Sequence, residues 1–281
     1  MVGLAAVVLV AVGCGDGSSD GGSGASDGVS AAQLTRYLPP DQISYVAVDL
    51  DALRSEGLLA DDDPIAPPGE DADPLASFAV GSALSGLAAT PLDDATTEAL
   101  DLKSATAMAG AGGSGANVTA FATSADADDI TSALEEVGYA EQDGVLTSDD
   151  KEAAFRVDDG VVIAAAGEEG LSRVPGEPLG EAPDPLLEES GSPYTEALIY
   201  DGGDKCLRSM VTALNGDGTG TVSFRTVDAP DPKNLTFEDT DSASFDDPVV
   251  DGDVISVDGT GDPSALAIRN TIQQFFFFYD C

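Results

Sequence analysis

The chain contains no histidine among its 281 residues. Histidine is the commonest general base, a frequent zinc ligand and the usual partner of a nucleophilic Ser or Cys, so its absence removes those routes to catalysis. The 52 Asp and Glu residues still allow one catalytic alternative, a hydrolase that uses a pair of carboxylates. The absence of Trp argues against the sugar cleft that such an enzyme needs. We therefore expect no catalytic residues.

Two glycine-rich segments have the spacing of ligand-binding loops. Gly110, Gly112 and Gly115 match G-x-G-x-x-G, which binds a dinucleotide only where a helix follows the loop. A strand is expected to follow here, so the segment is interpreted as a hairpin tip. Residues 215–220 match the first half of a calcium loop, but Thr226 stands where the bidentate carboxylate is required. The sequence therefore predicts a turn there, and neither a cofactor nor a bound metal.

The first residues have the pattern of an export signal. Met1–Val12 is uncharged and apolar, too short to span a bilayer but suited to the core of a signal peptide. Val10–Cys14 resembles the lipobox of bacterial and archaeal lipoproteins, with Ala11 in place of the usual Leu. That resemblance implies a signal peptide over 1–13 and a membrane anchor through lipid on Cys14. The alternatives are a plain secretory peptide or a buried strand, with Cys14 incidental.

The composition after Cys14 favours an exposed, oxidising location. Residues 14–30 are rich in Gly, Ser and Asp and are expected to form a flexible tether. If Cys14 carries lipid, Cys206 and Cys281 remain as a pair that would form a disulfide outside the cell, the alternative being two buried thiols.

Two sequons become accessible to glycosylation if the chain is exported. They begin at Asn117 and Asn234. The alternative is that both arise by chance and are buried in strands.

The net charge of −41 indicates adaptation to brine. Such a charge destabilises a compact state by self-repulsion. The Debye length falls from about 10 Å at 0.1 M salt to about 3 Å at 1 M, which almost removes that repulsion. Acidic residues are spread along the chain, so the overall pattern resembles haloarchaeal cell-surface proteins. A protein that binds basic partners or cations is the alternative. Nucleic acid is excluded as a partner because no basic stripe exists to neutralise phosphates.

The stretch Leu38–Arg54 resembles the opening of a group of bacterial and archaeal surface lipoproteins of unknown function. The shared features are a Leu-Pro pair, an acidic residue, an aromatic-Val pair and the phrase Val-Asp-Leu. The resemblance implies a first strand and an extracytoplasmic setting, with no reaction attached.

Hydrophobic spacing and turn residues predict an α+β protein of mainly antiparallel sheets. We expect two ferredoxin-like halves, residues 31–175 and 194–281, joined by a Pro-rich and acidic linker over 176–193. Strands are predicted at Ile43–Leu50, Leu102–Gly110, Asn117–Thr123, Tyr139–Gln142, Val145–Thr147, Ala153–Val157, Val161–Ala166, Thr195–Tyr200, Gly220–Val227, Asn234–Glu238 and Asp253–Val257. Helices are predicted at Ala31–Leu38, from an Asp51 cap to Leu59, at Pro74–Leu87, from an Asp126 or Asp128 cap to Val137, at Glu168–Val174, at Pro185–Glu189, from an Asp204 cap to Leu214, and from a Ser264 cap to Phe278.

The sequence as a whole predicts an exported, lipid-anchored, salt-adapted protein at the cell surface. Its expected role is structural or in interaction, without catalysis. The first alternative is a lipoprotein that captures a solute, which requires a pocket with convergent polar groups between the two halves. The second is the carboxylate hydrolase, which requires two facing buried acids.

Overall fold

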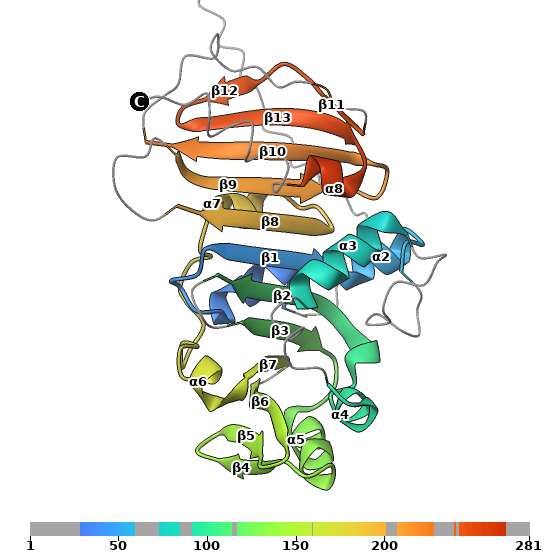
Figure 1. The fold of residues 1–281 in the computed structure, drawn as a ribbon, viewed down its shortest axis with the longest axis vertical. Helices are drawn as coiled ribbons and strands as arrows, with labels where there is room; N and C mark the ends of the chain where they lie inside the picture. The colour runs from blue at the N-terminus through green and yellow to red at the C-terminus, as the bar shows by residue number, and fades with distance from the viewer. Residues whose placement is uncertain are drawn as a thin grey trace, which may run out of the picture.

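The computed structural model describes residues 29–59, 73–84, 92–113, 117–158, 160–200, 207–227, 239 and 242–267. Within these ranges the strands form one antiparallel sheet of 13 strands, which runs the length of the molecule (Figure 1). The strand order is β11-β13-β10-β9-β8-β1-β2-β3-β7-β6-β5-β4, and β12 also pairs with β13. The strands are β1 Ser44–Asp49, β2 Ala105–Gly112, β3 Val118–Thr123, β4 Ala140–Gln142, β5 Val145–Ser148, β6 Lys151–Asp158, β7 Val161–Ala166, β8 Tyr194–Ile199, β9 Leu207–Leu214, β10 Thr219–Thr226, β11 Ala243–Phe245, β12 Val249–Asp251 and β13 Val254–Gly261.

Short helices cover both faces of this sheet, which confirms the predicted α+β class. The face toward the viewer in Figure 1, here the front face, packs against α2, α3, α5 and α8. The opposite, back face packs against α1, α6 and α7. The helices are α1 Ala31–Leu34, α2 Leu50–Ser55, α3 Pro74–Ala83, α4 Asp94–Ala99, α5 Ala127–Glu136, α6 Gly167–Leu171, α7 Pro185–Glu189 and α8 Pro263–Leu266, with 3₁₀ turns at Thr35–Tyr37 and Leu102–Ser104.

The sheet does not divide into the two ferredoxin-like halves that were predicted. Strand β1, from the first expected half, pairs with β8, from the second, in a register that sets Val46 opposite Glu196. The physical reason is that an unpaired strand edge exposes backbone donors and acceptors, and each of these edges satisfies the other. Segment 176–193, expected to be a linker, contributes α7 and the buried Leu187 to the back face.

Strand β9 replaces a predicted helix. Leu207, Met210, Val211 and Leu214 have helical spacing, yet Leu207–Leu214 is an extended strand between β8 and β10. Because β9 is covered on both faces, almost every residue in it is buried, and the alternation that identifies a strand is lost. Strand β1 is also buried on both faces rather than on the one apolar side that was predicted.

Two helix caps differ from the prediction. Asp49, not Asp51, caps α2 by accepting a hydrogen bond from Ala52 N at 2.8 Å. Asp262, not Ser264, caps α8 and accepts from Ser264 N at 2.8 Å. In both cases the acid just before the helix has the extended backbone that a cap requires. Helix α8 ends at Leu266 and Ala267 is extended, so one helix does not run on from Ser264 as predicted; residues 268–281 lie outside the described ranges.

Both predicted tight hairpins are confirmed. The turn between β4 and β5 places Asp143 at φ 53° and Gly144 at φ 79°, the left-handed conformation that a two-residue turn needs. Strands β6 and β7 pair on either side of Gly160, which has φ 70°. These turns bring neighbouring strands into register without help from distant parts of the chain.

Helix α3 lies close against β2 and β3 on the front face. A Cβ placed on Gly110 would come within 2.5 Å of Ala83 O, so only glycine permits this approach. Thr119 Oγ1 donates a hydrogen bond to the same oxygen at 3.1 Å. The end of α3 is therefore fixed to the middle of the sheet by one small residue and one hydroxyl.

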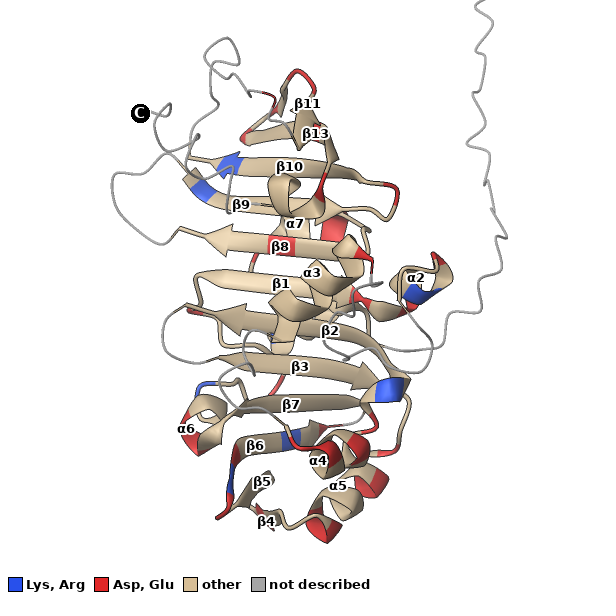
Figure 2. Cartoon of the chain, turned by 45° about the vertical axis from the view of Figure 1, so that its right-hand side comes forward, with Lys and Arg blue, Asp and Glu red and all other residues tan. Residues whose placement is uncertain are grey.

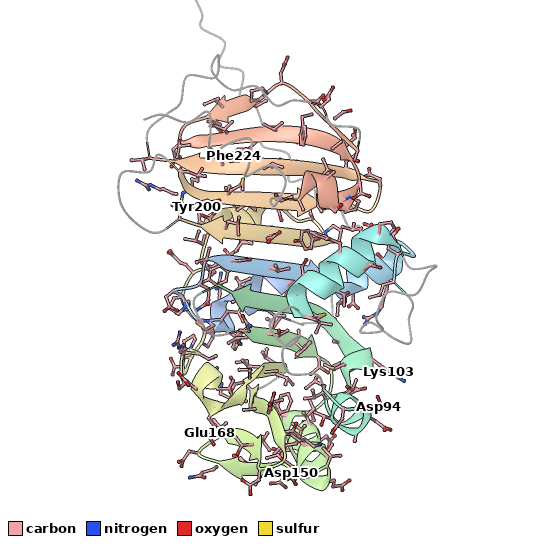
Figure 3. All side chains as sticks on the ribbon, in the orientation of Figure 1. Asp94, Lys103, Asp150, Glu168, Tyr200 and Phe224 are labelled. Atoms are coloured by element: carbon pink, nitrogen blue, oxygen red, sulfur yellow. The ribbon has the colours of Figure 1, made fainter. Side chains whose placement is uncertain are left out.

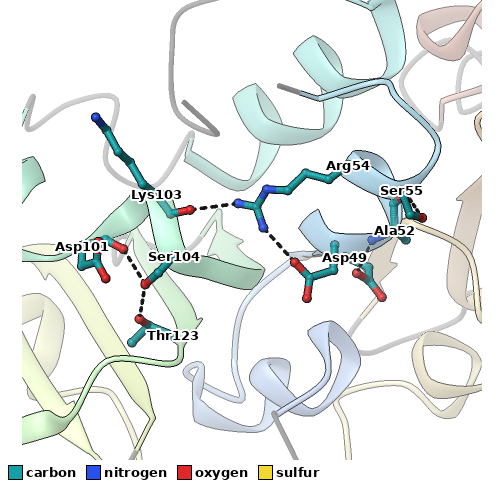
Figure 4. Close-up of polar contacts among 9 residues, drawn as sticks. Asp49, Ala52, Arg54, Ser55, Asp101, Lys103, Ser104 and Thr123 are labelled. Carbon is teal, nitrogen blue, oxygen red and sulfur yellow. Dashed lines mark hydrogen bonds and ion pairs between the residues drawn. The ribbon is translucent and has the colours of Figure 1, made fainter. Parts of the chain in front are cut away.

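Arg54 fixes the neighbouring helix α2 to the start of β2 (Figure 4). Its guanidinium bonds Asp51 Oδ1 at 2.8 Å and Lys103 O at 3.4 Å. Close by, the hydroxyls of Ser104 and Thr123 share a hydrogen bond of 2.9 Å that joins the ends of β2 and β3. The bond from Arg54 thus joins α2 to the 3₁₀ turn that precedes β2.

Candidate functional site

Most residues to which the sequence assigned a chemical role lie outside the described ranges. This applies to the predicted lipidation residue Cys14, to the predicted disulfide pair Cys206 and Cys281, and to the sequon residue Asn234. Their roles stay predictions.

Asn117 is described, and it is exposed at the start of β3. The rest of its sequon is not accessible in the fold. Thr119 is fully buried, and its hydroxyl is occupied by Ala83 O. An enzyme that must read the hydroxyl of the third residue can reach this sequon only before β3 enters the sheet.

The second glycine-rich segment is a turn, as predicted, whereas Gly115 of the first lies outside the described residues. Gly110 and Gly112 lie in β2, and the next described element is strand β3 rather than a helix. In the turn between β9 and β10, Thr219 Oγ1 donates to Asp217 Oδ1 at 2.6 Å and accepts from Asn215 Nδ2 at 3.1 Å. The hydrogen bonds from Thr219 hold the pKa of Asp217 below its usual value. These side chains therefore bond each other, and the described residues contain no metal-ligand cluster.

A groove lies on the back face of the sheet, among the described residues. It has a volume of about 350 Å³, and we call it the α7 groove. One wall is α7 with the residues after it, the floor is β9, β10 and β13, and the strand β12, which pairs with β13, lies at the edge of that floor. The lining residues are Leu186, Glu189, Ser190, Ser192, Val211, Ala213, Thr221, Ser223, Asp251, Val254 and Ser256.

A buried carboxylate holds the α7 wall in place. Asp184 is 2 % exposed and caps α7 by accepting from Leu186 N at 2.9 Å. Its other oxygen accepts a hydrogen bond from the Ser209 hydroxyl and one from Arg225 Nη1 at 3.2 Å. At the outer side of α7, Glu188 accepts from Arg36 Nε at 2.9 Å. Helix α7 is thus bonded to β9, to β10 and to the 3₁₀ turn Thr35–Tyr37.

Two of the three hydroxyls on the floor of the groove already donate their protons within the protein. Thr221 Oγ1 donates to Asp258 Oδ1 at 2.6 Å, which leaves its lone pairs as acceptors. Ser223 and Ser256 share a hydrogen bond of 3.0 Å. With Glu189 on α7, Asp251 on β12 and no Lys or Arg in the lining, the groove is rich in acceptors and negative in charge.

The groove is not the pocket between two halves that a solute-capturing protein was predicted to need. It lies between the expected linker and strands of the expected second half. Sequence reasoning found α7 and β10 but not the groove, because residues such as Glu189 and Asp251 meet only through long-range strand pairing. The alternating Thr221, Ser223 and Arg225 on β10 were a partial signal, since they marked one polar face of that strand.

The buried carboxylates of the described residues do not face each other. Asp184 lies on the back face, whereas Glu196 lies on the front face and accepts from the hydroxyl of Tyr194 at 3.0 Å. Burial, together with the charge of Glu196, raises the pKa of Tyr200 to about 12. The arrangement that the hydrolase alternative requires is therefore not found in the part of the chain described here.

No helix within the described ranges is long and apolar enough to cross a membrane.

No protein-family description and no curated protein matches the sequence. The solved structures similar to this chain include crystal form I of TP0453, at 10 % identity and a TM-score of 0.43, over 88 % of this chain and 99 % of that one. Crystal form IV of TP0453 gives 10 % identity and a TM-score of 0.44, over 83 % and 94 %. These scores are too low to carry an argument about this chain.

Proposed function

We propose that the chain is an exported, lipid-anchored and salt-adapted protein of the cell surface, with a structural or interaction role and without catalysis. The observation that carries this proposal is the order of segments at the start of the chain. An apolar run ends at Gly13-Cys14, a polar leader follows, and the first helix begins directly after its capping residue Ser30. Such a leader would let the sheet stand away from a membrane to which Cys14 is attached.

The placement of charge supports adaptation to salt. Asp and Glu gather on α4, α5, α6 and the turns, whereas the central strands carry few charges (Figure 2). Asp94, Asp150 and Glu168 are exposed and project outward (Figure 3). The 11 basic residues cannot neutralise 52 acidic ones, so most carboxylates repel each other unless ions screen them. We therefore propose that the protein, like the haloarchaeal surface proteins that it resembles in composition, is adapted to high salt.

Intact-mass analysis of the native protein tests the anchor. We expect a chain that begins at Cys14, with added mass for lipid and, if both remaining cysteines pair, the loss of two hydrogen atoms on oxidation to the disulfide. Protein recovered from the cytosol with Met1 in place would overturn the proposed location.

Circular dichroism during desalting tests the adaptation to salt. We expect the strand signal to be lost as the salt falls from molar to dilute concentration and to return when salt is restored. A neutral osmolyte at equal osmolality is the control, because it does not screen charge. A spectrum that is unchanged in dilute buffer would contradict the proposal.

A further inference from the structure

We propose that the α7 groove binds a small aliphatic ammonium compound, an organic cation with one or two primary amino groups on a short carbon chain. The inference goes beyond the proposed function, because it holds whether or not Cys14 carries a lipid. It starts from the size of the groove. A volume of about 350 Å³ lies at the lower end of the range of about 300–1,000 Å³ found for ligand sites.

Charge selects a cation. The two described arginines that bond α7 and its cap are already paired, Arg36 with Glu188 and Arg225 with Asp184, and neither is part of the lining. The charged residues in the lining are Glu189 on α7 and Asp251 on β12. Neither has an ion-pair partner among the described residues, and both are exposed to solvent. An anionic ligand would meet repulsion from both carboxylates.

Hydrogen bonding selects a primary amine over a neutral polyol. Two of the three floor hydroxyls have already donated their protons, Thr221 to Asp258 and one serine of the Ser223–Ser256 pair to the other, so the floor offers more lone pairs than free protons. An ammonium group has three donors and no acceptor, which fits such a surface. A sugar needs donors as well as acceptors from the protein, and the two carboxylates of the lining, Glu189 and Asp251, supply acceptors alone.

The apolar part of the lining selects a short aliphatic body. Leu186, Val211, Ala213 and Val254 offer methyl groups to a carbon chain. The lining contains no aromatic ring, which is the feature that a quaternary ammonium ligand would need. The occupant that fits is therefore an alkyl amine or diamine.

Pentane-1,5-diamine is the probe that tests this inference, with pentane-1,5-diol as the neutral isostere and glutarate as the anion. Binding to the full-length folded protein is followed by NMR in molar salt. Under that condition the Debye length is about 3 Å, so general attraction to the acidic surface is screened. We expect the diamine to bind with a dissociation constant of about 1 mM or tighter and to shift the amide signals of Ser223 and Ser256. We expect the diol and glutarate to leave these signals unchanged.

The variant Glu189→Gln/Asp251→Asn should weaken diamine binding about tenfold for each carboxylate, because it removes two charge-assisted hydrogen bonds. The matched control is Asp150→Asn/Glu168→Gln, which removes the same charge from exposed positions on the other half of the sheet and should not change binding. The inference is overturned if the diamine does not bind, if the diol binds equally well, or if the control pair weakens binding as much as the groove pair.

Discussion

Arg225 Nη1 lies 3.2 Å from Asp184 Oδ2, although the two residues are 41 positions apart in the chain. This contact joins the cap of the short helix α7 to the seventh residue of strand β10 and helps to fix the α7 wall of the groove. The Asp184 side chain is 3 % exposed and the Arg225 side chain 25 %, so neither charge is well solvated. Loss of this pair should therefore destabilise the protein more than loss of an exposed ion pair would.

Asp184→Ala should destabilise the fold by about 2–4 kcal/mol, because it leaves Arg225 without its partner and removes the cap of α7. Asp184→Asn should cost less, since an amide oxygen can still accept from Leu186 N. Chemical denaturation in molar salt measures both. Glu181→Gln, an exposed change in the same segment, is the control and should leave the free energy of unfolding within about 0.5 kcal/mol. Equal stability of Asp184→Ala and wild type would show that α7 is held by other contacts.

Gly110→Ala should destabilise the protein by about 1–3 kcal/mol, because the new Cβ would meet the backbone oxygen of Ala83 at 2.5 Å and neither backbone can move easily. Gly81→Ala is the matched control, on the helix α3 that Gly110 contacts. A Cβ at Gly81 meets nothing within 4 Å, so the change should stabilise α3 by about 0.5–1 kcal/mol. Thermal unfolding in high salt distinguishes the two directions, and a neutral Gly110→Ala would mean that α3 is not docked as described.

Alkaline pH should destabilise the protein through Tyr45. Burial raises its pKa to about 12 from the usual value near 10. The folded state therefore holds the phenol proton more tightly than the unfolded chain does. The resulting stability is present below about pH 10 and is lost as the pH rises toward 12. Denaturation midpoints measured across this range should fall, with a further contribution from Tyr200, whose pKa is also raised to about 12.

Tyr45→Phe isolates the contribution of the phenol group. At neutral pH we expect a loss of about 1–2 kcal/mol, because the hydroxyl donates to Pro39 O at 2.6 Å and accepts from Gln42 N at 3.2 Å. The fall between pH 10 and 12 should become shallower in this variant. Tyr37→Phe serves as the control, since no hydrogen bond to its hydroxyl is found within the described residues. An unchanged pH profile in Tyr45→Phe would assign the alkaline loss to other groups.

The Asn117 sequon gives a prediction that separates folding from modification. Asn117→Gln should remove any glycan without changing stability, because the residue is exposed. Thr119→Ala should remove the glycan and also cost about 1 kcal/mol, through loss of the bond to Ala83 O. Thr119→Ser should preserve both. Intact mass and denaturation of protein from a host that glycosylates its exported proteins provide the two readouts. If a glycan is added to protein that is already folded, β3 must leave the sheet transiently and expose Thr119, contrary to our expectation.

The local parts of the fold could be read from the sequence because they depend on few neighbouring residues. The Asp143-Gly144 turn needs only two residues that tolerate positive φ, and α7 needs only a Pro after a capping Asp. The α+β class followed from the same local signals. The sequence assigned the caps of α2 and α8 to Asp51 and Ser264, each two positions after the observed caps Asp49 and Asp262, because neighbouring polar residues can fill the same role.

The sheet as a whole was decided by contacts between distant residues. The spacing of Leu207, Met210, Val211 and Leu214 fits a helix, and only burial on both sides makes β9 a strand. The pairing of β1 with β8 joins two segments that the sequence separates by more than a hundred residues, and it replaces two expected halves with one sheet. The α7 groove has the same origin, because Glu189 and Asp251 have no local signal that relates them. What the sequence by itself determined is the acidic surface, the export pattern and the hairpins, all of which depend on composition or on adjacent residues. Strand order, two-sided burial and the groove required the tertiary structure, because the free energy that selects them comes from long-range pairing and packing.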